Sequence, residues 1–178
     1  MISAWIPKRY DNASLSELKP TQKHIIGNLN KTGDLIIQGA IGTGKTYIGC
    51  AYANFLIKKE VSARYITEYE FTGLFTHRHS SDTGTAREAE IKINNCKSCH
   101  TLIIDEVGKR KLTDNQQVEL DELISDRYNN MKRTIFITNL TGEEFKLRIG
   151  DRAYDRLRDN EAELITITGK SLRGEAWH

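Results

Sequence analysis

The sequence is poor in several residue types that mark particular protein classes. Among its 178 residues there are only two prolines and three cysteines. No apolar run approaches the roughly 20 residues that a membrane-spanning helix needs, and the amino terminus lacks the apolar stretch of a secretory signal. An odd number of cysteines without an export signal predicts reduced thiols in a cytoplasmic protein and argues against a disulfide framework.

A strong charge imbalance is also absent. The net charge is +2 and the isoelectric point is near 8.4, which neither requires nor excludes a polyanionic partner. With 38% hydrophobic residues and no low-complexity tract, the chain has the composition and length of one globular domain. We predict an amino-terminal arm over residues 1–20 and one domain over residues 21–178.

Short apolar runs alternate with segments in which apolar residues recur at helical spacing. The predicted strands are residues 35–37, 64–67, 101–104, 134–138 and 164–168. The predicted helices are residues 21–30, 45–58, 68–77, 85–95 and 114–130, and polar, basic helical segments are predicted within residues 143–158. Five strands separated by helices predict an α/β fold, in which an open parallel sheet carries helices on both faces.

The stretch QGAIGTGKT, residues 38–46, has the spacing G-x4-G-K-[ST] between a predicted strand and a predicted helix. Glycines let backbone N–H groups converge on phosphate oxygens, and the following helix directs its positive end at them. Lys45 would add a cation and Thr46 would hold Mg²⁺. The predicted nucleotide-binding residues are Gly39, Gly42, Thr43, Gly44, Lys45 and Thr46. A glycine-rich turn that binds nothing is the alternative.

Two acids follow the next apolar strand in TLIIDEVG, residues 101–108. A buried strand that ends in Asp105 places a carboxylate beside the phosphate loop, where it can hold Mg²⁺, and Glu106 can polarise a water for attack on the terminal phosphoryl group. The alternative is an acid pair that begins a solvated loop. Asn139, after the strand TIFIT, can orient that water if its strand lies between the other two, although asparagine is also a common turn residue.

Together, GAIGTGKT, LIIDEVG and ITNL, followed by DRAYDRLRDN and ITGKSLRG, resemble the AAA+ ATPases of the DnaC and DnaI helicase-loader group and the related IstB transposition helpers. The resemblance extends over about residues 20–175. It implies a P-loop NTPase fold with an AAA+ core, a reduced or absent helical lid, and ATP with Mg²⁺ as cofactors. In its terms, Lys45 and Thr46 belong to Walker A, Asp105 and Glu106 to Walker B, and Asn139 is the first sensor.

The resemblance also gives roles to arginines near the end of the chain. Arg156, in DRLR, matches an arginine finger offered to a neighbouring subunit, with Arg152 and Arg158 as other candidates. Arg173, in GKSLR, matches the second sensor. A finger supplied in trans makes turnover depend on an ATP-dependent oligomer. An ion pair between Arg156 and an aspartate on its own helix is the alternative.

The implied function is ATP hydrolysis in DNA replication, with the protein loading a replicative helicase onto single-stranded DNA in a bacterial or phage-infected cell. An IstB-like transposition helper is a second candidate, and an ATP-gated adaptor or a small P-loop kinase would belong to other classes. Glu106 beside Asp105, together with Arg156, argues against a kinase, because a kinase must exclude water.

Residues 68–100 correspond to the insertion with which AAA+ initiators and loaders grip single-stranded DNA. Cationic and aromatic side chains suit sequence-tolerant binding to phosphates and bases. The candidate contacts are Phe75, His77, Arg78, His79 and Arg87, with a second basic cluster at Lys109, Arg110 and Lys111. A packed helix pair and a solvated loop are the respective alternatives.

Overall fold

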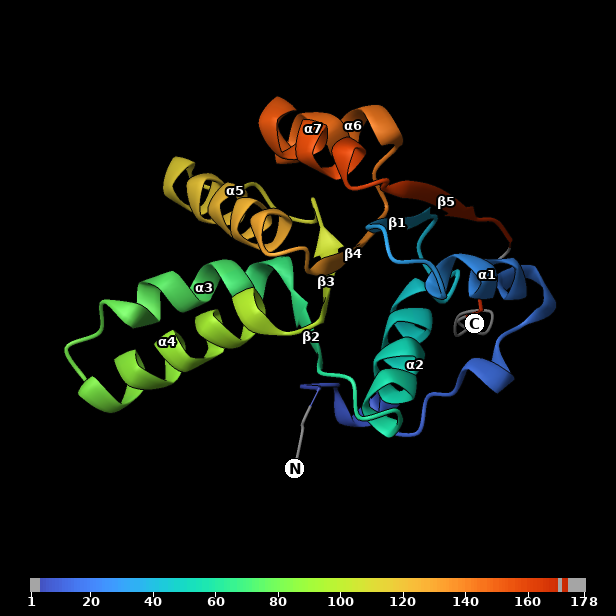
Figure 1. Cartoon of the computed structure of the whole chain (residues 1–178), viewed down its shortest axis with the longest axis horizontal. Helices are drawn as coiled ribbons and strands as arrows, with labels where there is room; N and C mark the ends of the chain where they lie inside the picture. The colour runs from blue at the N-terminus through green and yellow to red at the C-terminus, as the bar shows by residue number, and fades with distance from the viewer. Residues whose placement is uncertain (1–3, 170, 173–178) are drawn as a thin grey trace, which may run out of the picture.

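A parallel β-sheet forms the centre of the molecule (Figure 1). The structure is a computed structural model that describes residues 4–169 and 171–172. Within these residues the strands are Leu35–Gly39 (β1), Ala63–Thr67 (β2), Thr101–Val107 (β3), Arg133–Thr138 (β4) and Glu163–Ile167 (β5). They form one five-stranded sheet in the order β2-β3-β4-β1-β5, with every neighbouring pair parallel. The predicted α/β class and parallel sheet are confirmed.

Helices cover both faces of this sheet (Figure 1). The α-helices are Ile26–Leu29 (α1), Lys45–Lys58 (α2), Glu68–Arg78 (α3), Thr83–Ser98 (α4), Asp114–Asn129 (α5), Gly142–Ile149 (α6) and Asp151–Asp159 (α7), and short 3₁₀ turns span Lys8–Tyr10, Leu15–Glu17 and Pro20–Ile25. The pair α3 and α4 extends away from the β2 edge as a hairpin. No helix in the described part of the chain has the length and hydropathy to cross a membrane.

Reciprocal side-chain caps fix where three of these helices begin. The Thr67 hydroxyl accepts a hydrogen bond from the Glu70 N–H, and the Glu70 carboxylate accepts one from the Thr67 N–H. The same arrangement pairs Thr113 with Gln116 and Thr141 with Glu144. A cap of this kind stabilises a helix start by about 1 kcal/mol, so α3, α5 and α6 have sharply defined first residues.

The hydrophobic core has one part on each face of the sheet. The part under α3 to α7 includes Phe71, Ile93, Leu123, Phe136 and Phe145. The part under the amino-terminal arm, α1 and α2 includes Ile25, Leu29, Ile37, Ile48 and Ile103. Burial on both faces explains why the central strands read as nearly continuous apolar runs in the sequence.

Two details differ from the predicted elements, and a third makes one of them more specific. Gly150 has φ = +85°, a conformation that favours glycine, and it is the boundary at which the helical segments predicted within residues 143–158 separate into α6 and α7. The predicted helix 21–30 is largely a 3₁₀ turn that begins at Pro20 and continues as the short α1. Strand β3 runs to Val107, through both acids, because Val107 pairs with Thr138 of β4 after a register shift that follows Ile104.

Candidate functional site

The sheet order brings the three sequence motifs together at one edge. Strand β4, which leads to Asn139, lies between β1, which leads to the phosphate loop (residues 39–46), and β3, which carries Asp105 and Glu106. Since all these strands are parallel, their carboxyl ends lie side by side. The condition on which the prediction for Asn139 depended is therefore met.

The phosphate loop needs glycine for both conformation and space. Gly42 and Gly44 have φ of +84° and +87°, where other residues are strained. A Cβ on Gly42 would lie 2.1 Å from Ser171 Oγ, and one on Gly39 would lie 2.5 Å from the Ile167 carbonyl oxygen. Side chains at these positions are thus excluded, and the backbone curls directly before the first turn of α2.

The polar side chains of the loop bond mainly to the loop itself. Lys45 donates from Nζ to the carbonyl oxygens of Gly39 and Ala40, at 2.7 and 2.8 Å. Thr43 donates from Oγ1 to the same Ala40 oxygen at 2.9 Å. The Lys45 ammonium is therefore held against the backbone of the loop that is predicted to bind phosphate.

Asp105 connects the phosphate loop to the acidic residues at the end of β3. Thr46 donates from Oγ1 to Asp105 Oδ2 at 2.7 Å, although 59 positions separate these residues in the chain. The Glu106 N–H donates to Asp105 Oδ1 at 2.6 Å. The Tyr65 hydroxyl, from β2, also donates to Oδ2, at 2.6 Å. Asp105 is 2% exposed, and these bonds hold its carboxylate in one orientation.

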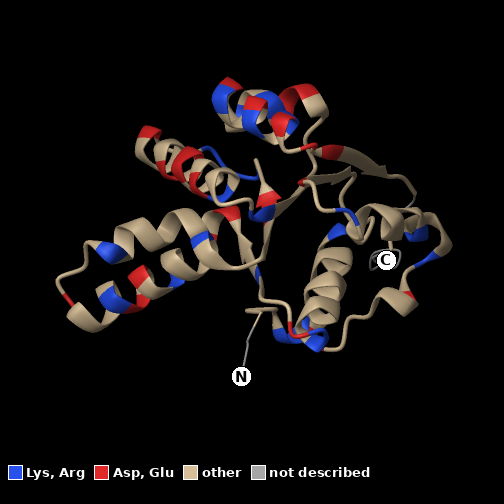
Figure 2. Ribbon diagram, in the orientation of Figure 1, with Lys and Arg blue, Asp and Glu red and all other residues tan. Residues whose placement is uncertain are grey.

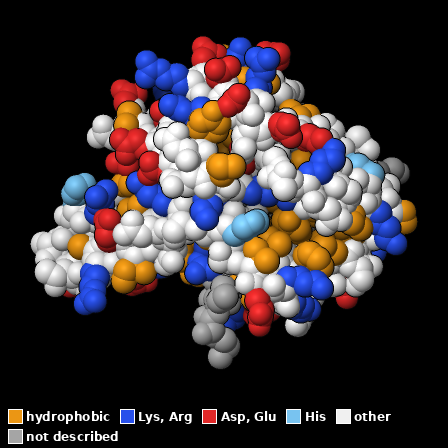
Figure 3. Space-filling view, in the orientation of Figure 1, with side chains coloured by type: hydrophobic (Ala, Val, Ile, Leu, Met, Phe, Trp, Pro, Cys, Tyr) orange, Lys and Arg blue, Asp and Glu red, His pale blue; other side chains and the backbone are white. Residues whose placement is uncertain are grey.

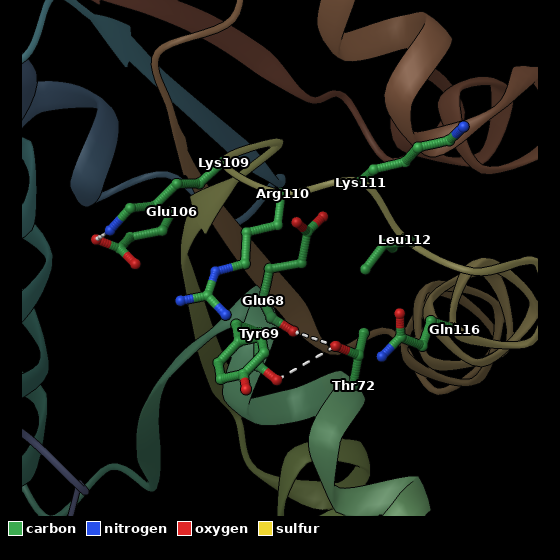
Figure 4. Close-up of a pocket in the computed structure, with 9 residues that line it drawn as sticks. All are labelled: Glu68, Tyr69, Thr72, Glu106, Lys109, Arg110, Lys111, Leu112 and Gln116. Carbon is green, nitrogen blue, oxygen red and sulfur yellow. Dashed lines mark hydrogen bonds and ion pairs between the residues drawn. The ribbon is translucent and has the colours of Figure 1, made fainter.

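Glu106 has an unusual backbone and an ionic partner. Its φ is +58°, in the left-handed region that side chains rarely adopt. Its Oε1 lies 2.6 Å from Lys109 Nζ in a half-exposed ion pair, which Figure 4 draws as a dashed line. Backbone strain of this kind concentrates at functional sites, and here it falls on the residue predicted to polarise water.

A buried carboxylate supports the turn after Glu106. Glu68 is 2% exposed, and its Oε2 accepts a hydrogen bond from the Gly108 N–H at 3.1 Å. It also forms an ion pair with Arg148 of α6. Nearby, the Arg110 guanidinium lies over the Tyr69 ring at 3.9 Å from its centroid, and Glu68, Tyr69 and Arg110 line a small cavity of about 80 Å³ (Figure 4). These contacts hold the turn against the start of α3.

A larger cavity of about 760 Å³ lies beside the phosphate loop. Its volume is in the range of ligand-binding pockets. The predicted residues that line it are Gly42, Gly44, Lys45, Thr46, Asp105, Glu106 and Asn139. The amino-terminal arm contributes Arg9, Tyr10, Glu17 and Lys19, and Gln22 follows just after the arm.

Sequence reasoning missed the contribution of the arm and of Gln22 to this cavity. Gln22 donates from Nε2 to the Thr43 carbonyl at 2.8 Å, and Tyr47 of α2 bonds to both Glu17 and the Ser14 N–H. Polar residues that flank a phosphate loop at a distance of 20 or more positions carry no spacing signal. Their place follows from the packing of the arm along α2.

The arginine predicted as a finger lies away from this cavity. Arg156 is on α7, and its Nη1 lies 3.3 Å from Asp121 of α5. The alternative expected an ion pair with Asp155 or Asp159 of the same helix, whereas Arg156 pairs with Asp121 of another helix. Arg152 and Arg158 are exposed on α7, which Figures 2 and 3 show in a region dense in charged side chains. Arg173 lies outside the described residues.

One candidate DNA contact was wrong. Phe75 is 9% exposed and packs edge to face against Phe71, with ring centroids 5.3 Å apart. The two rings are four positions apart, so they share the inward face of α3. His77, Arg78, His79 and Arg87 are exposed at the far end of the α3–α4 hairpin, where Arg78 pairs with Glu90.

The geometry fits a nucleotide with its metal ion. The cradle excludes side chains, Lys45 is at its mouth, and Thr46 and Asp105 present hard oxygen atoms of the kind that Mg²⁺ prefers. Among the described residues there is no group of three or more His, Cys, Asp or Glu side chains that could hold a metal by themselves. Any Mg²⁺ would accordingly be shared with the phosphates, as is usual for this ion.

Comparisons with known proteins agree with this geometry. The replicative helicase loader DnaC of Buchnera aphidicola subsp. Baizongia pistaciae is 27% identical over 153 residues, which are 85% of this chain and 61% of that protein. The chain thus spans about three fifths of the length of this relative. A crystal structure of the DnaC helicase loader has a TM-score of 0.74 at 24% identity and covers 91% of this chain and 100% of that one.

A structure of the replication initiator DnaA bound to AMPPCP and single-stranded DNA has a TM-score of 0.70 at 18% identity, covering 93% of this chain and 52% of that one. At these identities, the likeness to solved structures establishes the fold, an AAA+ P-loop domain. A family model described as IstB-like ATP binding protein matches residues 12–176. Because that match includes nearly the whole sequence, the chain belongs to the IstB-like ATP-binding protein family.

Proposed function

We propose that the chain binds ATP with Mg²⁺ in the 760 Å³ cavity and hydrolyses it to ADP and phosphate. The observation that carries this proposal is the hydrogen bond from Thr46 to Asp105, which joins the end of the phosphate loop to the end of β3 beside that cavity. Bound Mg-ATP supplies the phosphoryl group and a counter-charge for its oxygens. Side chains of this chain bind the phosphates, hold the metal ion and orient the attacking water.

Each residue of the site has a role that follows from its place. The loop N–H groups and Lys45 bind the phosphates, and Lys45 exchanges its two carbonyl partners for phosphate oxygens. Thr46 and Asp105 hold Mg²⁺. Glu106 polarises the attacking water with its carboxylate, one oxygen of which is paired with Lys109. Asn139, exposed at the end of β4 and lining the cavity, orients the same water.

We further propose that turnover depends on assembly. Arg156 would act on the nucleotide of a neighbouring protomer, where its charge stabilises the transition state, with Arg152 and Arg158 as the other candidates. Its position on an exposed helix, away from its own cavity, is what a residue acting in trans requires. For Arg173 the second-sensor role rests on the resemblance of GKSLR.

The proposed partners are single-stranded DNA and a replicative helicase. The relatives named as helicase loaders support the second, and the DnaA structure that contains single-stranded DNA supports the first. On this chain, His77, Arg78, His79 and Arg87 offer an exposed cationic end of the α3–α4 hairpin for phosphates. The family model favours one other candidate, a transposition helper of the IstB kind.

One set of assays tests these proposals. ATP hydrolysis is measured against protein concentration, with and without single-stranded DNA, for the wild type, Lys45→Ala and Arg156→Ala. We expect turnover that rises more steeply than linearly, increases with DNA, and is lost in both variants. Linear, DNA-independent turnover that Arg156→Ala leaves intact would overturn the assembly model. Stimulation by duplex DNA together with failure to capture a purified replicative helicase would favour the transposition helper.

A further inference from the structure

We propose that Tyr65 is a positioning residue for the metal-binding carboxylate, and that its hydroxyl sets how strongly nucleotide binding depends on Mg²⁺. The inference rests on the proposed nucleotide site. Tyr65 lies in β2, next to the strand that carries Asp105, and its hydroxyl donates to Asp105 Oδ2 at 2.6 Å. The sequence motifs of the site do not include this residue.

The position of Tyr65 leaves it little freedom. Its side chain is 4% exposed, within the core between the sheet and α2, and its N–H donates to the Ala4 carbonyl at 2.8 Å. The backbone of β2 is fixed by its parallel pairing with β3, in which Tyr65 lies opposite Ile103 and Thr67 opposite Asp105. The ring must therefore reach along the sheet toward Asp105, and its hydroxyl arrives at a fixed point.

The hydroxyl remains a donor over the physiological pH range. A tyrosine hydroxyl ordinarily ionises at about pH 10, well above the physiological range. Tyr65 can therefore donate its hydrogen bond while Asp105 is ionised. A neutral donor of this kind orients a carboxylate without neutralising it, so the charge of Asp105 stays available to a cation.

Tyr65 differs from the other donor on the same oxygen. Thr46 also donates to Asp105 Oδ2, at 2.7 Å, but Thr46 is itself a proposed metal ligand. Tyr65 is thus the donor to Oδ2 that takes no part in binding the metal. Removing its hydroxyl would leave the buried carboxylate oriented by Thr46 and the Glu106 N–H alone. Loss of an outer partner of this kind commonly changes metal affinity by about 10- to 100-fold.

The test is Tyr65→Phe, which deletes only the hydroxyl. Binding of a fluorescent, non-hydrolysable ATP analogue is measured in EDTA and over a Mg²⁺ titration. We expect the Mg²⁺ concentration at half-maximal enhancement to rise about tenfold, whereas affinity in EDTA changes by less than about twofold. Because both affinities are measured on the same folded molecules, a partial loss of folded protein does not alter their ratio.

Tyr52→Phe is the matched control. Tyr52 is a buried tyrosine on α2, and its hydroxyl donates to the Leu29 carbonyl at 2.7 Å, away from the cavity. This variant should keep the wild-type Mg²⁺ midpoint even where its melting temperature falls. An unchanged or lower midpoint in Tyr65→Phe would overturn the inference while leaving the nucleotide site in place. A wild-type protein whose analogue binding ignored Mg²⁺ would overturn the proposed function, and the inference with it.

Discussion

Glu68, the first residue of α3, and Arg148, in α6, form an ion pair with two contacts across 80 positions of the chain. Arg148 donates from Nε to Glu68 Oε1 at 3.0 Å and from Nη2 to Oε2 at 2.6 Å. The two side chains are only 3% and 13% exposed, and Oε2 also accepts the Gly108 N–H. The pair therefore ties the turn after the acidic residues to helices on either side of it.

Arg148→Ala is expected to lower the free energy of unfolding by about 3 kcal/mol, because it leaves a buried carboxylate without its counter-charge. The measurement is equilibrium unfolding in urea. Lys146→Ala is the control on the same helix, since its pair with Asp151 is exposed and should contribute less than about 0.5 kcal/mol. Equal losses of unfolding free energy in the two variants would show that the ion pair between Glu68 and Arg148 does not stabilise the turn after Glu106.

The contact between Lys109 and Glu106 gives a second prediction. The ammonium occupies one oxygen of the carboxylate that is proposed to polarise water. Lys109→Ala should therefore raise the ATP turnover at saturating nucleotide, by up to about fivefold for a half-exposed pair. Lys111→Ala, an exposed lysine of the same turn, is the control and should leave turnover in the absence of DNA unchanged. A fall in turnover specific to Lys109→Ala would assign this lysine a supporting role instead.

The phosphate loop gives a third prediction. Gly42→Ala should weaken binding of an ATP analogue at least about tenfold and cost about 1–2 kcal/mol of stability, because φ is +84° and the added Cβ meets Ser171. Gly73→Ala is the control in α3, where an added Cβ meets nothing within 4 Å, and it should stabilise the protein by about 0.5–1 kcal/mol. Titration calorimetry and thermal unfolding measure both effects. Normal analogue binding by Gly42→Ala would contradict the role of the loop as a phosphate cradle.

Local patterns in the sequence were enough to predict most of the fold and the centre of the site. Lys45–Lys58 is a helix as expected, and the phosphate loop, Asp105 and Asn139 meet because each lies at the carboxyl end of a parallel strand. The spacing within each motif can be read directly from the sequence. The strand order that brings the motifs together is that of a common fold, so it could be expected once the motifs were found. The boundary between the helical segments of residues 143–158 could not be placed at Gly150 from the sequence, because one glycine in a helical pattern is often tolerated.

The supporting contacts could not be predicted in this way. Tyr65 meets Asp105 across 40 positions, and Glu68 meets Arg148 across 80, at distances that depend on register and helix packing. No spacing rule connects such pairs. Phe75 was misplaced for a related reason, because an aromatic residue next to histidines and arginines is as consistent with a DNA contact as with the inward face of α3.

The role of Arg156 can be separated from that of its ion pair by a comparison with Asp121. Their contact at 3.3 Å is about one third exposed on each side, so losing it should cost less than about 1 kcal/mol. Asp121→Ala removes the pair but keeps the arginine, whereas Arg156→Ala removes both. If Arg156 acts in trans, ATP turnover by the assembled protein is lost in Arg156→Ala and retained in Asp121→Ala, although the two are equally stable in urea. Equal losses of turnover would instead indicate that the pair matters only for the packing of α7 on α5. Mixing Arg156→Ala with Lys45→Ala provides the decisive measurement. The first variant keeps an intact nucleotide site, and the second keeps an intact arginine. If Arg156 acts in trans, each mixed interface that joins the intact site of one variant to the intact arginine of the other should regain activity.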